Sequence, residues 1–357
     1  MSSPLPTLSV LGCGLVTSVG FNAPSSLAAM RAGTRNVRET NLWDAMTGEY
    51  LAAGKVDLPQ WSLGAAKWAD LVAPAVSECL VAAMPVPPSE IPVLLILPPH
   101  DRPHLPSGVN VHLLEEISFR LGRPLHPDSG AFAGDRVAML AALTRVQQWL
   151  STHPGGFCVV AGVDSFVEPK VVEYYRKRRR ILTADNSNGF SPGEAGSAIL
   201  VGGSEHPFTD EIQILGWGTG REVATPESDE PLRGEGLITA IGQALQASGI
   251  TMPETDYRIA DLNGEHDRFK EMTFAMLRFE RQPREALNEL WHPAEYVGEV
   301  GAAIGPMLLA TALHAGQKDY GVGPTSLCTL SNDDGARGCI VARYRNLASR
   351  DTVDGVA

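Results

Sequence analysis

The cysteines of this chain are few, and none are spaced as a pair. There are five among 357 residues, and no two show the Cys-x-x-Cys spacing of metal or redox motifs. The count is odd, and the start of the chain has neither the basic stretch nor the apolar core of a signal peptide. We therefore expect free thiols in a reducing, cytoplasmic setting, with Cys13, Cys158 and Cys339 buried in apolar or glycine-rich runs.

Long apolar runs are missing as well. No window holds the roughly 18 uninterrupted apolar residues that suggest a membrane-spanning helix, so no membrane partner is expected. Positive charge is also scarce, because 29 Lys and Arg stand against 41 Asp and Glu and give a net charge of -12. This balance argues against a nucleic-acid partner, since phosphate contacts need a concentrated positive surface.

Basic and metal-ligating residues offer only two local clusters. The basic run 176–180 fits a solvated helix face or end, or a patch that binds an acidic carrier protein. We favour the solvated face or end. His100 and His104 stand four apart, but neighbouring prolines exclude the regular helix that would aim both side chains at one ion. We expect no metal and no cofactor.

The chain does contain an alternation of apolar strands and amphipathic helices. Strands are predicted within 8–20, 91–97, 157–166, 211–220 and 256–263, and helices within 23–33, 136–150 and 236–250. Ser25 and Ser26 are expected to cap the first helix, and Gly33 and Gly249 to end the first and last. Several strands are apolar throughout, which predicts α/β layers in which both faces of a sheet are covered.

The order strand, glycine-rich turn, helix occurs near the start of the chain and again from residue 211. We interpret this repetition as two similar halves, residues 1–205 and 206–345, followed by a flexible tail at 346–357.

Four segments, in this order, resemble the thiolase-like condensing enzymes, the ketoacyl synthases in particular. They are VLGCGLVTSVGFNAPSSLAAMRAG, VVAGVDSF, NGFSPGEAGSAILV and LSNDDGARGCIVARY. The resemblance spans about residues 8–344. It implies a thiolase-like fold of two βαβαβαββ halves in five α/β/α/β/α layers, usually dimeric, which agrees with the two halves expected from periodicity.

The resemblance also implies a catalytic set that this chain lacks. The family uses a Cys at a helix start to take the acyl chain and two imidazoles to stabilise an enolate. Ungapped counting places Arg136 at the nucleophile position, or Asp135 or Gly134 with a shift, and we expect Asp135 to cap the helix. Glu265 and Ala302 occupy the two imidazole positions, with His266 one step beyond the first.

The C-terminal hairpin departs from the family too, because Asn332, Asp333 and Asp334 replace a Phe that gates the acyl tunnel. Polar groups at that gate disfavour a fatty chain. The residues expected to line one cleft are Asp135, Asn263, Arg268, Gly301, Asp333, Asp334 and Arg337. We expect an ion-pair network of Glu265, Arg268, Lys270, Asp334 and Arg337 to fill it.

These departures favour a catalytically degenerate ketoacyl-synthase-like protein that acts as a binding or assembly partner. It would form a homodimer or a heterodimer with another thiolase-like chain, as a chain length factor does, through residues 157–166 and 166–185. The loop at 261–265 and the hairpin resemble stand-alone thiolase-like proteins of bacterial polyketide-type and type VI secretion effector clusters. An acyl carrier protein or a secreted effector is therefore a possible partner. The alternative is a non-covalent acyl-thioester enzyme, an acyltransferase, hydrolase or decarboxylase, with Glu265 and His266 as acid and base.

Overall fold

The sheet of this protein consists of two five-stranded parts joined at one corner. The computed structural model describes residues 5–106, 108–203, 205–280 and 288–347. The first part has the order β1-β7-β6-β4-β5, formed by β1 (Leu8–Val16), β7 (Glu194–Gly202), β6 (Phe157–Ser165), β4 (Val93–Leu97) and β5 (Gly130–Ala133). The second has the order β8-β12-β11-β9-β10, formed by β8 (Asp210–Arg221), β12 (Ala336–Asn346), β11 (Thr325–Ser331), β9 (Tyr257–Ala260) and β10 (Glu289–Trp291). Residues 8–10 of β1 pair with β8 and connect the two parts.

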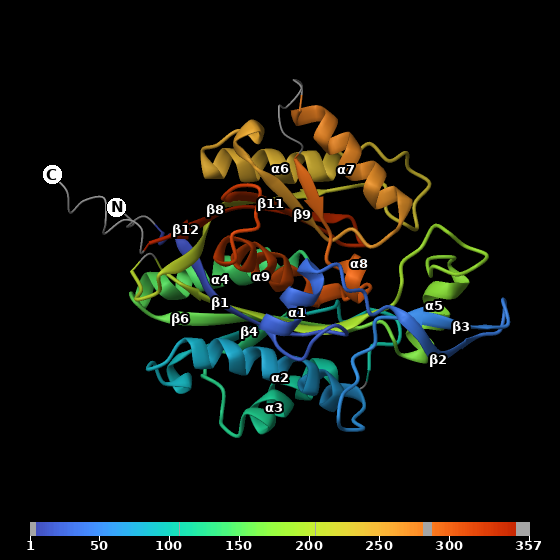
Figure 1. Cartoon of the computed structure of the whole chain (residues 1–357), viewed down its shortest axis with the longest axis horizontal. Helices are drawn as coiled ribbons and strands as arrows, with labels where there is room; N and C mark the ends of the chain where they lie inside the picture. Colours follow the sequence, from blue (N-terminus) through green and yellow to red (C-terminus); the bar gives the residue numbers. More distant parts are fainter. Residues whose placement is uncertain (1–4, 107, 204, 281–287, 348–357) are drawn as a thin grey trace.

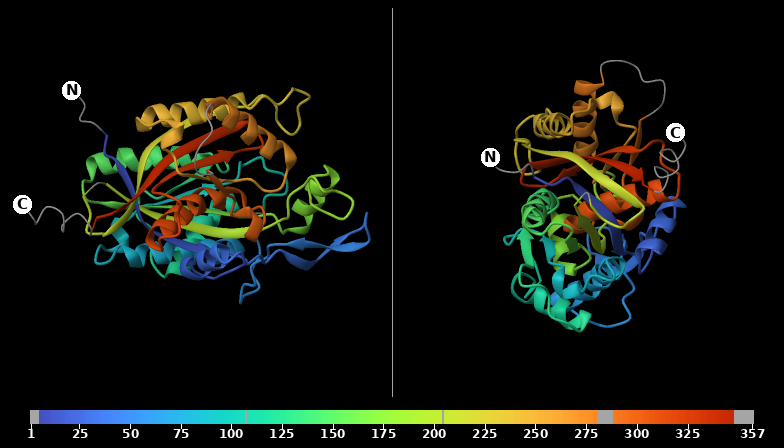
Figure 2. Two further views of the ribbon diagram at one scale, coloured as in Figure 1. Left: turned by 45° about the horizontal axis from the view of Figure 1, so that its top comes forward. Right: turned by 90° about the vertical axis from the view of Figure 1, so that its left-hand side faces the viewer.

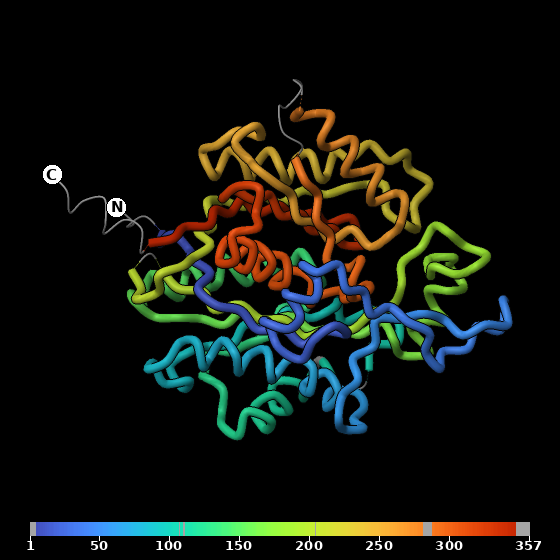
Figure 3. Tube along the Cα trace, viewed as in Figure 1, coloured from blue at the N-terminus to red at the C-terminus, as the bar shows by residue number. Residues whose placement is uncertain are grey.

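Helices cover both faces of each part of the sheet, which gives five layers (Figure 1). The outer layers are α2 (Gly64–Ala82) with α3 (Val109–Leu121), and α6 (Glu235–Ser248) with α7 (His266–Phe279). The middle layer contains α4 (Ala138–Thr152) and α9 (Ile304–Gln317). The predicted α/β arrangement of two βαβαβαββ halves is confirmed. In Figure 3 the first half runs from blue to green and the second from yellow to red, and α9 of the second half lies in the middle of the molecule.

Short elements decorate this framework. They are α1 (Ala23–Arg31), α5 (Pro169–Lys177), α8 (Ala294–Val297) and three 3-10 turns at Pro88–Glu90, Met252–Glu254 and Gly301–Ala303. A separate hairpin, β2 (Arg38–Asp44) with β3 (Glu49–Ala53), projects from the body (Figure 2). In the described ranges, no helix is long and apolar enough to cross a bilayer.

Close packing between α2 and the sheet depends on glycines. A Cβ at Gly14 of β1 would lie 2.0 Å from the carbonyl oxygen of Ala75, and one at Gly196 of β7 would lie 2.2 Å from that of Leu71. Side chains at these positions would push α2 away from the sheet. The motif containing Gly196 also holds Glu194, which is fully buried and accepts hydrogen bonds from Ser165 Oγ (2.8 Å) and the Val56 amide (3.0 Å). Glu194 therefore links β7 to β6 and to the segment that follows β3.

Two local predictions were wrong. The first helix is capped by Asn22, whose side chain accepts from the Ser25 amide, rather than by Ser25 or Ser26. Strand β6 at 157–165 pairs on both sides, with β4 and β7, so its backbone cannot extend a sheet into a partner. The boundaries 1–205 and 206–345 remain predictions. In the predicted tail, Asn346 ends β12, and residues 348–357 lie outside the described residues.

Candidate functional site

A cleft of about 1240 Å³ opens between loops of the two halves. Its walls come from residues near 99–103, 174–188 and 221–232. Its floor comes from the turn before α4, the start of α7 and the β11–β12 turn. Of the residues expected to line one cleft, five lie around this cavity, namely Asp135, Arg268, Asp333, Asp334 and Arg337, whereas Asn263 and Gly301 do not line it.

The turn between β5 and α4 carries Asp135, whose φ of +57° is unusual for a residue other than glycine. The amides of Gly134 and Asp135 donate to the Leu97 carbonyl at 3.0 and 2.9 Å. A strained turn between a strand and a helix is a geometry that can present one side chain to a cleft. Here it places Asp135 on the cavity wall.

Asp135 does not cap α4, contrary to the prediction. The Val137 amide donates instead to Asn332 Oδ1 at 3.1 Å, and Asn332 Nδ2 donates to the Gly134 carbonyl at 2.8 Å. Asn332 comes from the β11–β12 turn, so the cap is supplied by the other half of the chain. Local sequence could not indicate it, because the two residues are 195 positions apart.

Arg136 forms the floor of the cleft. It is only 2% exposed, and its guanidinium donates to the Ser331 carbonyl and lies against Glu299, both at 2.8 Å. Asp261 is 3.8 Å away. Burial would lower the pKa of Arg136, but the surrounding carboxylates outweigh it and raise that pKa well above its ordinary value. Arg136 is therefore a buried, paired arginine.

Glu299 is the main partner of Arg136, and the sequence prediction did not assign it. One oxygen accepts from the Gly301 amide at 2.8 Å, and the other accepts from Asn263 Nδ2 at 2.6 Å. Burial would raise the pKa of Glu299, but Arg136 and Arg268 lower it below its usual range. A single acid between Gly298 and Gly301, shortly before the apolar helix α9, was the signal available in the sequence.

Four charged side chains form a second layer above this floor. Arg180 donates to Glu265 Oε1 at 2.6 Å and to Asp333 Oδ2 at 2.7 Å. Arg268 donates to Asp333 Oδ1 at 2.9 Å and lies 3.4 Å from Glu265. Burial would raise the pKa values of Glu265 and Asp333, yet the two arginines hold both below the ordinary values. We name these four residues the upper network.

The interpretation of the run 176–180 as a solvated face was wrong in part. Arg176 is buried and donates to Asp44 at 2.8 Å and Asp185 at 2.9 Å, and Arg180 belongs to the upper network. Only Lys177, Arg178 and Arg179 are exposed. The structure thus uses two of the five cations internally.

The composition of the predicted ion-pair network was also partly wrong. Lys270 is exposed, and Asp334 is exposed and accepts from the nearby Ala336 amide at 2.9 Å. Arg337 forms a separate buried pair with Glu271 at 2.8 Å. His266 is exposed at the start of α7, and its backbone amide donates to Asn188 Oδ1. Glu265 and His266 therefore do not face a common point.

The position of the second imidazole lies in the 3-10 turn before α9. Ala302 is fully buried there, and its amide lies 3.4 Å from Asp164 Oδ2. Gly301 has a φ of +48°, and a Cβ at Gly301 would lie 2.0 Å from the same carboxylate oxygen. Asp164 is held in turn by Arg102. Asn263 and Gly301, which the sequence placed on the cleft wall, lie behind the floor instead.

The five thiols are all free, and none lines the cleft. Four are buried as expected for Cys158 and Cys339, whereas Cys13 is only partly buried. Burial raises the pKa values of Cys13 and Cys158 to about 12. Thiols this weakly acidic carry almost no thiolate at neutral pH.

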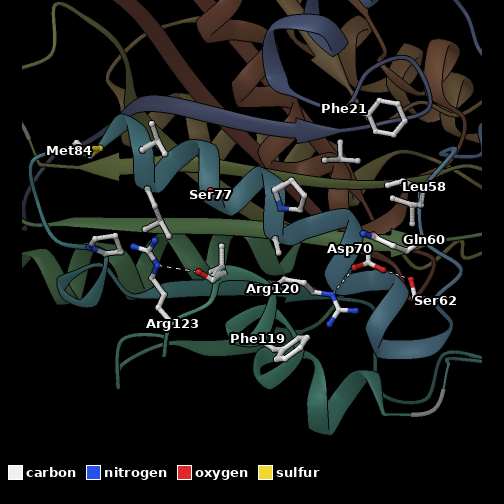
Figure 4. Close-up of a pocket in the computed structure, with 18 of the residues that line it drawn as sticks. Phe21, Leu58, Gln60, Ser62, Asp70, Ser77, Met84, Phe119, Arg120 and Arg123 are labelled. Atoms are coloured by element: carbon white, nitrogen blue, oxygen red, sulfur yellow. Dashed lines mark hydrogen bonds and ion pairs between the residues drawn. The ribbon is translucent and has the colours of Figure 1, made fainter.

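A second cavity of about 1090 Å³ lies on the far side of the first half, along α2 and α3 (Figure 4). Its walls are mostly apolar, and Phe119, Met84 and Phe21 are more than half exposed. Its polar groups bind one another: Arg120 donates to Asp70 at 2.7 Å, and Asp70 accepts from Ser62. This groove was not predicted from the sequence, because its lining is scattered over four segments.

No family model matches the chain, and no curated protein matches it. Solved structures do match it. The complex of a type II polyketide synthase acyl carrier protein with its ketosynthase contains a chain with TM-score 0.74, 13% identity, and coverage of 95% of this chain and 100% of that one. The ketosynthase–chain length factor complex of Xenorhabdus doucetiae matches with TM-score 0.72 and 12% identity, over 97% of this chain and 100% of that one. The ishigamide ketosynthase/chain length factor matches with TM-score 0.64 and 18% identity, over 94% of this chain and 99% of that one.

The chain has the thiolase-like fold of the ketosynthases. Identities of 12–18% establish the fold and nothing about activity. In this fold, Asp135 and Arg136 lie in the turn that precedes α4.

Asp135 is a poorly partnered carboxylate of the cleft. Its Oδ1 is buried without a hydrogen-bond partner in the described structure, and its Oδ2 is 3.4 Å from Arg136. Burial raises its pKa, Arg136 opposes this effect, and the charges of Asp164, Asp333 and Glu299 add to it, so the pKa reaches about 6. At neutral pH, ionised Asp135 therefore lowers the stability of the folded protein.

The Asp135→Asn variant is expected to be more stable than the natural protein at pH 8, by roughly 2–3 kcal/mol. An unfolded Asp has a pKa near 3.9, so the stability that Asp135 contributes is complete below about pH 4 and is lost as pH rises through about 6. Asn avoids this loss and tolerates a positive φ. Urea unfolding at pH 5 and pH 8 should show a smaller difference at pH 5.

Asp334→Asn, a change at an exposed carboxylate of the same cleft, should leave stability nearly unchanged at both pH values. An equal gain for Asp135→Asn at pH 5 and pH 8 would contradict the electrostatic explanation.

Proposed function

We propose that this protein is a ketosynthase-fold partner protein, similar in role to a chain length factor, that does not perform Cys-dependent condensation. The observation that carries this proposal is the burial of Arg136, bound to Glu299, at the turn where the resemblance places a nucleophilic cysteine. A guanidinium cannot accept an acyl group under physiological conditions, because it stays protonated. Asp135, its neighbour, is not a thiol either.

The rest of the cleft supports the same proposal. Glu265, at one imidazole position, is ionised and bound by Arg180, so it cannot donate a proton to an enolate. Ala302, at the other, has no proton to give. A fatty chain would meet the charged upper network rather than an apolar tunnel, and desolvating such groups costs about 1–3 kcal/mol for each one left without a partner.

Strand β5 provides a route for association. It lies at the end of the first part of the sheet and, in the described structure, pairs only with β4. An open strand edge can pair with a strand of another chain, so a homodimer or heterodimer would extend this sheet. This edge replaces β6, which the sequence analysis had suggested. The solved neighbours include ketosynthases with chain length factors, and we propose a thiolase-like partner of that kind in the cytoplasm.

An acyl carrier protein is a second candidate partner. One neighbour is a ketosynthase in complex with an acyl carrier protein. Lys177, Arg178 and Arg179 are exposed, and the last two line the cleft. These three cations would suit an acidic surface. A secreted effector is the remaining candidate partner. A complex with such a protein that forms without an acyl carrier protein would favour it.

The alternative proposal, an acyl-thioester enzyme based on Glu265 and His266, has weaker support. Its two residues point to different places, and the pKa of Glu265 is lowered by Arg180 and Arg268 against the effect of burial. A general base needs a pKa close to the working pH and a common target for the pair.

Incubation with acetyl- and malonyl-coenzyme A, followed by intact-mass measurement, is expected to show no covalent adduct. Co-expression with a ketosynthase from the same genome is expected to yield a stable complex that survives size-exclusion chromatography. An acyl adduct on any residue would refute the first part of the proposal. Thioester hydrolysis that disappears in Glu265→Gln but persists in Asp267→Asn would support the enzyme alternative.

A further inference from the structure

The groove along α2 and α3 is an apolar surface that stays open in the described structure. Phe21, Val81, Met84 and Phe119 all line it and are 55%, 63%, 70% and 80% exposed. Together they present several hundred Å² of apolar surface to solvent, since one aromatic side chain alone offers about 150–250 Å². Apolar patches of that size mark binding surfaces in soluble proteins. The groove is therefore suited to an apolar occupant.

Helix α2 provides the length of the groove with one of its faces. Its lining residues follow helical spacing and cover about 17 Å of helix; they are Asp70, Ala73, Pro74, Ser77, Leu80 and Val81. Another face of α2 packs on the sheet at Gly14 and Gly196. The cavity volume of about 1090 Å³ lies above the roughly 300–1,000 Å³ of most small-molecule sites. An elongated occupant therefore fits better than a compact ligand.

Prolines reduce the number of backbone hydrogen bonds that the walls can offer. Proline has no N–H to donate, and five of the lining residues are prolines, namely Pro59, Pro74, Pro85, Pro87 and Pro88. An extended peptide binds by pairing its backbone with that of the receptor, so these walls do not suit a strand. An α-helix bonds its own backbone and presents only side chains, so it needs no such donors.

The two ends of the groove differ in charge. At one end, Arg120 binds both Asp70, at 2.7 Å, and Glu116, so its charge is neutralised within the chain. Figure 4 shows Arg123 to the left of this cluster. Arg123 is exposed, donates to the Leu121 carbonyl at 3.3 Å and forms no ion pair with a described residue. This arginine is available to an acidic side chain of a partner.

We propose that the groove is the docking site of an amphipathic α-helix from a partner protein. The apolar face of that helix lies along α2 and covers Val81 and Met84, and an acidic side chain at one end of it pairs with Arg123. This inference does not rest on the proposed function, because the association proposed there uses the edge of β5. Binding of a helical peptide to the purified chain tests the groove, whereas co-purification with a ketosynthase tests the other proposal.

The test measures the fluorescence anisotropy of a labelled peptide of about 18 residues, long enough to be partly helical alone. Its leucines follow helical spacing along one face, and a glutamate stands one turn beyond the last leucine. A second peptide has lysine in place of the glutamate, and a third has the composition of the first with its leucines scattered around the helix. The full chain should bind the glutamate peptide saturably. The lysine peptide should bind about 3- to 10-fold more weakly at low salt, and the scattered peptide more weakly still.

Matched variants locate the site. Val81→Asp should weaken binding at least about tenfold, because docking would bury an unpaired charge. Val111→Asp, at an exposed valine of α3 that does not line the groove, should leave binding unchanged. Arg123→Glu should reverse the preference, so that the lysine peptide binds more tightly. Arg35→Glu, at an exposed arginine outside the groove, should preserve the original preference. All four positions are exposed, and circular dichroism checks that each variant folds.

Four results would overturn the proposal. The first is a failure of the glutamate peptide to bind saturably, or equal binding of the scattered peptide. The second is an unchanged preference in Arg123→Glu. The third is a dimer in light scattering that Val81→Asp converts to a monomer, because a second copy of the chain would then cover the groove. The fourth is displacement of the labelled peptide by sodium dodecanoate at a lower concentration than by the unlabelled peptide, which would identify an acyl chain as the occupant.

Discussion

Replacing Arg136 by methionine should lower the free energy of unfolding by about 3–5 kcal/mol, because the change leaves buried carboxylates without their cation. Glu299 is nearly inaccessible to solvent and relies on Arg136 at 2.8 Å, and Asp261 lies 3.8 Å away. The variant would also lose the hydrogen bond to the Ser331 carbonyl that links the first half to the β11–β12 turn. Urea unfolding followed by circular dichroism at pH 7.5 measures the loss.

Two matched variants separate charge from packing. Arg178→Met removes an exposed arginine from the rim of the same cleft and should change stability by less than about 0.5 kcal/mol. Adding Glu299→Gln to Arg136→Met should recover a large part of the loss, since the remaining amide is neutral. A double variant no more stable than the single one would show that the cost comes from lost packing, and the ion-pair explanation of the floor would fail.

Gly301→Ala is the second substitution with a large expected effect, a loss of about 3 kcal/mol or more. The backbone at Gly301 has a φ of +48°, where a side chain costs about 1 kcal/mol or more. The added Cβ would also lie 2.0 Å from Asp164 Oδ2, and crowding of this kind costs about 1–3 kcal/mol. Asp164 cannot retreat easily, because it is fully buried and bound to Arg102.

Gly249→Ala supplies the control for this prediction. Gly249 ends α6 with a φ of +70°, and nothing lies within 4 Å of the Cβ that it would gain. It therefore reports the backbone cost alone, about 1 kcal/mol. Thermal unfolding of both variants gives the comparison. Equal losses at the two positions would mean that Asp164 moves aside freely, and the tight contact between the 3-10 turn and β6 would not matter for stability.

The framework of this protein was predictable because its long elements follow regular periods. Strands such as β6 and β8 are nine and twelve residues long, and helices such as α4 repeat apolar residues at helical spacing. The sequence analysis missed β5, β10 and the β2–β3 hairpin. The first two have only four and three residues, and β5 is composed of Gly, Ala and Phe, so neither carries a measurable period.

The site was predictable as a set of converging segments but not as a set of pairs. The segments containing Asp135, Arg268 and Asp333 were expected at one cleft, and they do line it. The partners were not foreseeable, because Arg180 reaches Glu265 across 85 residues and Arg136 pairs with Glu299 of the other half. Charge alone does not specify which of several nearby acids an arginine selects. Lys270 and Asp334, which looked equally suitable, point to solvent.

The cap of α4 has a consequence for the order of synthesis. The amide of Val137 and the carbonyl of Gly134 are bonded by the side chain of Asn332, which is synthesised 195 residues after Val137. Until then, the helix beside the cleft begins with exposed backbone groups, however well the earlier strands have paired. We therefore expect a nascent chain that ends before residue 332 to hold a first half whose sheet is formed but whose cleft is not.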